Sequence, residues 1–193
     1  ILEHHRLISA MLQNAVYWQL LPSNPARRVK PPKTKKPKME FFNDDECKFL
    51  IQSLMELTGS NLKYKAAILL DIFSGVRRGE LIGLEWSDVD FKNETININK
   101  STQYLPENGI FDKDTKTECS NRIVPIPNYI TKTLLEYKEW YDEQKDIWGD
   151  KWINSNKLFI QDDGKPMHPD TIGKWFKPYI EKLGLPIIKF HGI

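Results

Sequence analysis

The amino-acid sequence predicts an α+β fold that is mainly α-helical and carries a small antiparallel sheet. Two patterns lead to this prediction: apolar residues recur at spacings of three and four along most of the chain, and alternation with a period of two is confined to a few short segments. With 193 residues, 40% of them hydrophobic, the chain is long enough for one domain with a buried core and part of a second.

The first predicted element is an amphipathic helix over residues 2–20, which ends before the prolines at 22 and 25. A single helix of this length is marginal in water, so its apolar stripe needs a partner. We therefore interpret it as the last helix of a preceding domain. The stripe is formed by Leu7, Ile8, Met11, Leu12, Ala15 and Trp18.

A short cationic segment follows. Residues 27–38 carry seven positive charges and no acid, so the rest of the chain has a net charge of −5 although the total is +2. Three prolines within the segment remove backbone donors and favour an extended conformation over a helix. The segment is interpreted as a solvated linker or as an extended stretch that lies along the backbone of a polyanion, and the two roles are compatible. The candidate backbone contacts are Arg27, Arg28, Lys30, Lys33, Lys35, Lys36 and Lys38.

Three helices are predicted next. Asn43 and Glu46 have the spacing of a capping box for a helix that ends at Gly59. A more apolar helix covers 62–73 and stops at the next glycine, and a short one covers 78–84.

The second half of the chain alternates short strands with helices. Period-two alternation predicts strands over 95–99 and 122–126, and Pro125 places the second at a sheet edge or a strand end. A polar connection, 103–121, is expected between them. The remaining predictions are a helix over about 129–145 capped by Asn128, a strand over 158–161 with a turn at 162–164, and a helix from Pro169 to Leu183.

Composition excludes several classes of protein. Cys47 and Cys119 are too few and too far apart for a disulfide framework or a CxxC zinc site, which favours a reducing, cytoplasmic compartment. The densest apolar run, residues 66–73, is too short for a membrane span, and the charged N-terminus is not a signal peptide. The four histidines have no further ligand at metal spacing, and no Walker loop, dinucleotide fingerprint or serine elbow is present.

Residues 74–81, Ser-Gly-Val-Arg-Arg-Gly-Glu-Leu, form the first candidate site. Gly75 ends one helix and Arg77 opens the next, so backbone amides and a guanidinium are expected to converge where anions bind. Glu80 lies three residues on and can orient Arg77. The alternative is an arginine–glutamate pair that only holds two helices together.

Lys116 and His191 are two further candidates. Lys116 lies in a Thr-Lys-Thr segment of the polar connection, where a lysine on a flexible hairpin can act as a general acid, although most loop lysines only face solvent. His191 lies in the terminal Phe-His-Gly-Ile and has the side chain best suited to proton transfer near neutral pH. Its alternative role is packing.

The order of these motifs resembles that of the tyrosine recombinase (phage integrase) family. After residues 74–81 come Glu-Trp-x-Asp-Val-Asp (85–90), Thr-Lys-Thr before an Arg-x-Val-Pro-Ile strand, and Phe-His-Gly-Ile. Residues 1–26 resemble the end of that family's core-binding domain, and the cationic segment resembles its linker. The resemblance covers essentially the whole chain and implies the fold of the DNA breaking–rejoining catalytic domains.

The resemblance also implies a reaction. In this family a tyrosine attacks a DNA phosphate to give a 3′-phosphotyrosyl intermediate, and neither a metal nor another cofactor is used. By position, Arg77 corresponds to the first catalytic arginine and Glu80 to the acid that orients the site. Lys116 corresponds to the acid for the 5′-oxygen, and His191 to the first histidine of a His-x-x-Arg pattern. A homo-tetramer on the attachment sites of double-stranded DNA is implied as well.

The sequence is therefore interpreted as an integrase of a phage or other mobile element in three parts: the terminal helix of a core-binding domain (1–26), a basic linker (27–40), and a catalytic domain (41–193) that is incomplete at its C-terminus. The second arginine, the next histidine and the nucleophilic tyrosine are expected beyond Ile193, so the chain is expected to bind DNA without cleaving it. The alternatives are a DNA-binding or regulatory module on the same scaffold, and a plain helical interaction protein.

Overall fold

The computed structural model of the chain describes residues 1–31, 41–114, 121–188 and 190. Two compact units are distinguished by their internal contacts, Ile1–Met39 and Glu40–Ile193. The first holds α1 and η1, and the second, the body, holds all other elements. The domain boundaries given above for the core-binding helix and the linker stay predictions.

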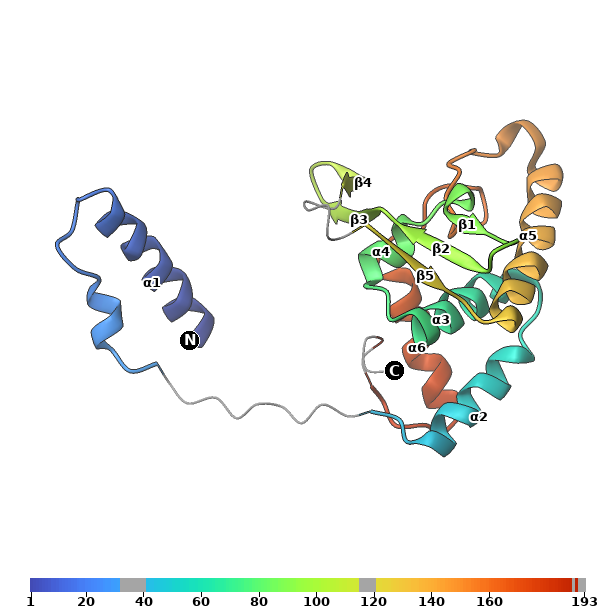
Figure 1. Ribbon diagram of the computed structural model, residues 1–193, viewed down its shortest axis with the longest axis horizontal. Coiled ribbons are helices and arrows are strands. Elements are labelled where there is room, and N and C mark those ends of the chain that lie inside the picture. Colours follow the sequence, from blue (N-terminus) through green and yellow to red (C-terminus); the bar gives the residue numbers. More distant parts are fainter. Residues whose placement is uncertain (32–40, 115–120, 189, 191–193) are drawn as a thin grey trace. The chain divides into compact units, whose positions relative to one another are not determined.

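Helices predominate in the body and its sheets are antiparallel, which confirms the predicted α+β class (Figure 1). Among the described helices, none is long and apolar enough to cross a bilayer. The elements of the body are α2 (Asp44–Met55), η2 (Gly59–Asn61), α3 (Leu62–Ser74), α4 (Arg78–Gly83), η3 (Trp86–Asp88), β1 (Val89–Asp90), β2 (Thr95–Ile98), β3 (Lys100–Leu105), β4 (Gly109–Asp114), β5 (Arg122–Pro125), α5 (Asn128–Trp148), η5 (Gly149–Lys151) and α6 (Thr171–Lys182).

In the first unit, α1 (Leu2–Tyr17) is shorter than predicted. Gln19 adopts a left-handed φ of 60°, and the Leu20 backbone N–H donates to the Ala15 carbonyl at 2.9 Å, which closes the helix. Most of the apolar stripe of α1 stays exposed within this unit, as the 63% exposure of Met11 shows, while Leu12 and Ala15 are half-buried.

A short 3₁₀ helix, η1 (Pro25–Arg28), follows α1. Asn24 caps it by accepting a backbone N–H at 3.0 Å and ties it to α1 by donating to the Ser9 carbonyl at 2.8 Å. The prediction that the cationic segment is extended is therefore wrong for Arg27 and Arg28. The Asn24 cap and Pro25, which follows it, start a helical turn that includes both arginines.

The start of the body follows the prediction. Asn43 accepts hydrogen bonds from the backbone N–H groups of Asp45 and Glu46, and the Glu46 carboxylate accepts from Asn43 N–H at 2.8 Å. The predicted capping box is thus confirmed. α2 then buries Leu50 and Leu54 completely.

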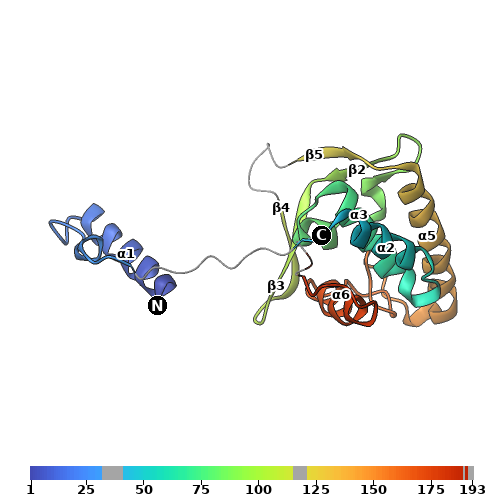
Figure 2. The same ribbon diagram turned by 90° about the horizontal axis from the view of Figure 1, so that it is seen from below.

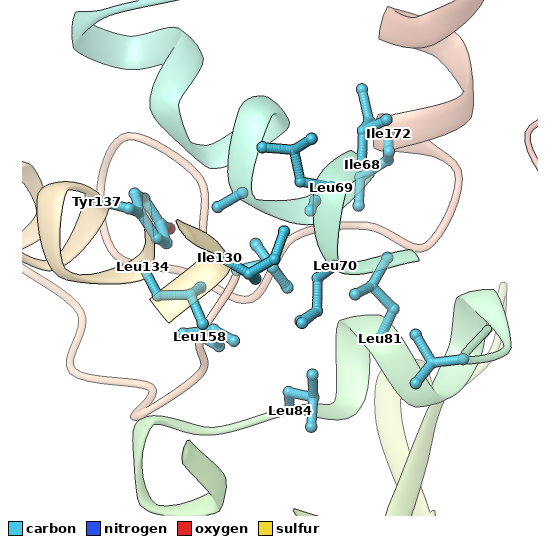
Figure 3. Close-up of a cluster of buried hydrophobic side chains, with 14 of the residues drawn as sticks. Ile68, Leu69, Leu70, Leu81, Leu84, Ile130, Leu134, Tyr137, Leu158 and Ile172 are labelled. Carbon is cyan, nitrogen blue, oxygen red and sulfur yellow. The ribbon is translucent and has the colours of Figure 1, made fainter. Parts of the chain in front are cut away.

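α3 forms the centre of the body. It packs against α5 on one side and α6 on another, and two views show this arrangement (Figures 1 and 2). Its residues Ile68, Leu69 and Leu70 have no exposed surface, so the end of α3, where the candidate site begins, is firmly held. The side chains around them include Leu81, Leu84, Ile130, Leu134, Tyr137, Leu158 and Ile172 (Figure 3).

The sheet that contains β2 has the strand order β1-β2-β5, with antiparallel pairs. β5 therefore lies at an edge, and Pro125 pairs with Thr95 at the end of the strand, where the missing proline N–H is tolerated. The predicted place of Pro125 is confirmed.

Within the predicted polar connection, 103–121, the structure shows two strands that were not predicted, β3 and β4, which form a β-hairpin up to residue 114. β3 and β4 pair in antiparallel register up to Leu105 opposite Gly109. The loop has three residues, 106–108, in which the Asn108 N–H donates to the Leu105 carbonyl at 3.1 Å, and Gly109 at the start of β4 has the left-handed φ of 69° that such a loop requires. The strands themselves lack alternation of apolar and polar residues, which is why periodicity missed them.

β3 lies directly against α4. A Cβ on Gly79 would overlap the Ser101 hydroxyl, and one on Gly83 would lie 3.1 Å from the Lys100 carbonyl oxygen. Both glycines therefore permit an approach that a larger residue would prevent.

Buried Lys157 fastens the hairpin to the body. Its ammonium donates to the Gly83 carbonyl at 3.1 Å and to the carboxylates of Asp112 at 2.6 Å and Glu85 at 3.3 Å. Lys100 also pairs with Glu85, at 2.8 Å. The position of β3 and β4 against α4 is thus set by charge as well as by close packing.

Two helix starts differ from the predictions. Asn128 is the first residue of α5 rather than its cap, because its side-chain amide donates to Glu94 at 2.5 Å. α6 starts two residues after Pro169, with Asp170 in the N-cap position.

The predicted strand over 158–161 is reduced to one isolated bridge, which joins Ile160 to Pro166. The predicted turn is confirmed, since Gly164 has a φ of 85° and donates its N–H to the Gln161 carbonyl at 3.1 Å. Pro166 has no N–H with which to extend the pairing.

Candidate functional site

The segment Ser74 to Arg77 connects α3 to α4. Gly75 ends α3 with a left-handed φ of 58°, and its N–H donates to the Asp71 carbonyl at 2.9 Å. Arg77 is extended, with φ −70° and ψ 147°, immediately before α4. This turn brings the Arg77 guanidinium to the same end of α4 as Glu80.

Glu80 binds Arg77 twice. Its Oε2 accepts the Arg77 backbone N–H and its Oε1 accepts the guanidinium Nη1, both at 3.0 Å. The carboxylate of Glu80 therefore occupies this backbone amide, and the expected anion site at the start of α4 stays a prediction. The guanidinium remains open to solvent, with 81% of the Arg77 side chain exposed against 5% of Glu80.

Sequence reasoning missed a second arginine at this carboxylate. Arg122, on β5, donates from Nη2 to the Glu80 Oε2 at 2.7 Å. Along β5, Arg122 and Val124 are half-buried while the residues between and after them are exposed, so a period-two pattern turns Arg122 inward. This alternation was the available signal, but only the fold shows which acid Arg122 meets.

Glu80 is held ionised by these contacts. Burial alone would raise the pKa of its carboxyl, but hydrogen bonds from Arg122 and from the backbone and side chain of Arg77 outweigh burial and lower the pKa. Glu80 therefore acts as a fixed anion that orients two guanidinium groups.

A first cleft, of about 570 Å³, lies between the end of α3 and the start of α4. Asp71 lies in it, and burial raises the pKa of its carboxyl from 3.8 to about 7. The described lining residues are Asp71, Ile72, Gly75, Val76, Arg77, Arg78 and Gly79.

A second cleft, of about 470 Å³, shares Arg77 and Arg78 with the first and is bounded by β3 and the start of α6. The rings of Tyr104 and His168 lie in it with their centroids 4.5 Å apart. The two clefts thus share the consecutive arginines and Gly79.

The structure brings Arg77 and Glu80 together among the predicted site residues. Lys116, His191, Lys33, Lys35, Lys36 and Lys38 lie outside the described residues, so their roles stay predictions. Arg27, Arg28 and Lys30 are exposed and belong to the first unit. Within the part of the chain that the structure describes, no three histidine, cysteine or acidic side chains are grouped so as to hold a metal ion.

Comparison with known proteins matches residues 40–193 to the sequence model of the phage integrase family. The ICEBs1 integrase of Bacillus subtilis is 28% identical over 185 residues, which cover 95% of this chain and 49% of that protein. The integrase of Staphylococcus phage L54a is 32% identical over 141 residues, or 67% of this chain and 38% of that protein. The chain thus spans less than half the length of these curated relatives.

Solved structures show the same fold. The Tn1549 transposon integrase in complex with transposon right end DNA superposes with a TM-score of 0.75 at 20% identity, covering 97% of this chain and 61% of that chain. A lambda integrase dimer bound to a COC′ core site superposes with a TM-score of 0.57 at 17% identity, covering 97% and 47%. At these identities the likeness concerns the fold alone.

Proposed function

Because the chain belongs to the phage integrase family, we propose that it supplies the catalytic core of a site-specific DNA recombinase. In the proposed reaction a tyrosine attacks a DNA phosphate and displaces the 5′-oxygen, which leaves a 3′-phosphotyrosyl intermediate; the 5′-hydroxyl of another strand reverses this step. The covalent intermediate conserves the energy of the broken bond.

The observation that carries this proposal is the exposed Arg77 guanidinium on a buried, ionised Glu80. A guanidinium held in place by its own carboxylate needs no reorganisation when a phosphate arrives, and it stabilises the negative charge that develops on the non-bridging oxygens. Arg122 holds the same carboxylate from the sheet and so supports the position of Arg77.

Lys116 is proposed as the acid that protonates the leaving 5′-oxygen, and His191 as a further group at the phosphate. The cationic segment is proposed to follow the DNA backbone. The partner is double-stranded DNA at attachment sites, as the DNA-bound Tn1549 and lambda integrases suggest. We further propose a homo-tetramer on DNA and a cytoplasmic location, where bacterial DNA lies.

DNA binding by this chain is the first test. The affinity for a short fluorescein-labelled duplex should fall steeply with salt, since each neutralised phosphate contributes about 0.9 to the slope of log affinity against log salt. Changing Lys33, Lys35, Lys36 and Lys38 to Gln should flatten this slope. The matched control changes four lysines of the body to Gln, Lys132, Lys145, Lys151 and Lys165, and should leave it steep. An unchanged slope in the first variant would mean that the segment is only a linker.

Strand cleavage is the second test, in the full-length protein with a nicked duplex that traps the covalent intermediate. Arg77→Ala should abolish cleavage with a smaller fall in melting temperature than Arg122→Gln, because the Arg77 side chain is 81% exposed against 34% for Arg122, which still holds the Glu80 carboxylate. A large fall in melting temperature would support a role in holding two helices together. DNA binding by the unmodified full-length protein without any cleavage would favour the non-catalytic alternative.

A further inference from the structure

Arg78 forms an ion pair that the proposed chemistry does not use. Its Nη1 lies 2.6 Å from Oδ1 of Asp170, 92 residues later in the chain. Asp170 occupies the N-cap position of α6, and its backbone N–H donates to His168 Nδ1 at 3.1 Å, which fixes the residue in front of the helix. Both side chains of the pair are nearly half exposed, at 45% and 46%.

The pair lies where two clefts adjoin. Arg78 and Asp170 line the second cleft described above and also a third, of about 430 Å³, along α6. Lys174 and Lys177 line the third cleft, are exposed, and are three positions apart, which puts them on one face of the helix.

The charge of this surface is opposite to that of the chain around it. Among the described residues that line the second and third clefts, Arg77, Arg78, Lys174 and Lys177 are cationic, and Asp170 is the single acid. Outside the cationic segment, the chain has a net charge of −5. Such a concentration of positive charge on an otherwise acidic chain fits a polyanion.

We propose that Arg78, Lys174 and Lys177 form a binding site for DNA phosphates on α4 and α6, and that Asp170 occupies Arg78 in the free protein in place of a phosphate. The proposal rests on the proposed function, and it names a second DNA surface besides the cationic segment. An ion pair this exposed is weak. A DNA phosphate that enters with counterion release therefore displaces the Asp170 carboxylate from the guanidinium.

The site is tested by the salt dependence of DNA binding, with this chain and a short fluorescein-labelled duplex of arbitrary sequence. Lys174→Gln with Lys177→Gln should weaken binding and reduce the slope by about 1.8, or about 0.9 for each phosphate that the variant no longer neutralises. The matched control is Lys145→Gln with Lys151→Gln. Both are exposed and belong to α5 and η5, away from the described lining of the three clefts. Equal effects of the two double variants would overturn the site.

The role of Asp170 is tested by Asp170→Asn, which keeps the size and shape of the side chain and removes its charge. Binding should tighten about two- to fivefold, the strength of an exposed ion pair. In an Arg78→Gln background the same change should have a clearly smaller effect. Equal tightening in both backgrounds, or none, would mean that Asp170 does not mask Arg78.

These outcomes are separable from failure of the proposed function. If the unmodified chain binds DNA with a steep salt slope, but the double variant of Lys174 and Lys177 binds DNA like its control, this inference fails and the proposed function stands. If the unmodified chain shows no salt-dependent binding, both fail. Melting temperatures within experimental error of the unmodified chain show that each variant is folded.

Discussion

Arg122 on β5 donates a hydrogen bond of 2.7 Å to the Glu80 carboxylate on α4, across 42 residues of sequence. This contact joins the edge strand of the sheet to the helix that presents Arg77. The local Arg77–Glu80 pair is thereby fixed to the rest of the body, and a sequence motif becomes a tertiary site.

Arg122→Gln should therefore destabilise the fold by about 1–3 kcal/mol, because a buried carboxylate loses a charged donor. Urea unfolding measures the change. Arg6→Gln, which breaks the exposed pair with Glu3, is the control and should cost less than about 0.5 kcal/mol.

The pKa of Glu80 is lowered in the folded state, so the contribution of this carboxylate to stability is present above its ordinary pKa of 4.5 and is lost as the pH falls. Arg122→Gln should reduce the amount of unfolding free energy that is lost at acid pH. A cost no larger than that of Arg6→Gln would contradict the prediction.

Asp71 should make the free energy of unfolding fall as the pH rises. Burial raises the pKa of its carboxyl from 3.8 to about 7, so between these values the folded state holds a proton that the unfolded state releases. The loss is on the order of 4 kcal/mol once the pH exceeds both values. Asp71→Asn should remove this part of the pH dependence and stabilise the protein at pH 8. Thermal unfolding from pH 4 to pH 8 measures this dependence. If stability changed with pH equally in the unmodified protein and in the Asp71→Asn variant, the prediction would be refuted.

Gly79→Ala should destabilise the body by about 1–3 kcal/mol, because the new Cβ would overlap the Ser101 hydroxyl and lie 3.1 Å from the Thr102 carbonyl oxygen. Ser101→Ala should restore part of the loss by removing the hydroxyl. Gly173→Ala is the matched control in α6, where nothing lies within 4 Å of the added Cβ, and should stabilise by up to about 1 kcal/mol. Denaturation midpoints of the four proteins provide the measurement. If Gly79→Ala matched Gly173→Ala, β3 would not lie against α4 as described.

Lys157→Ala should cost about 2–3 kcal/mol, since it leaves the carboxylates of Asp112 and Glu85 without their shared ammonium. The value is below that of a fully buried pair because Asp112 is 39% exposed. Lys165→Ala breaks an exposed pair with Asp163 and should cost less than about 1 kcal/mol. Equal effects on the unfolding midpoint would argue against a role of Lys157 in holding the hairpin.

Local features of this protein were predictable from the sequence because they depend on neighbouring residues. The Asn43–Glu46 capping box, the end of α3 at Gly75 and the Arg77–Glu80 pair all form between residues at most four positions apart, and each is present in the structure. The family was predictable as well, since it follows from the order of motifs along the chain, and the match over residues 40–193 confirms it.

The strands β3 and β4 were not predicted, because exposed strands lack periodicity. The starts of α5 and α6 were predicted wrongly, and for α5 the reason is that a distant side chain, Glu94, competes for the capping group of Asn128. The meeting of Arg122 with Glu80, of Lys157 with Asp112 and of Arg78 with Asp170 was invisible in the sequence. Each joins residues more than 40 positions apart, and no local pattern records such a pair. The sequence by itself determined which charged groups this protein carries, and the packing of α3 against its neighbours decided which of them face each other.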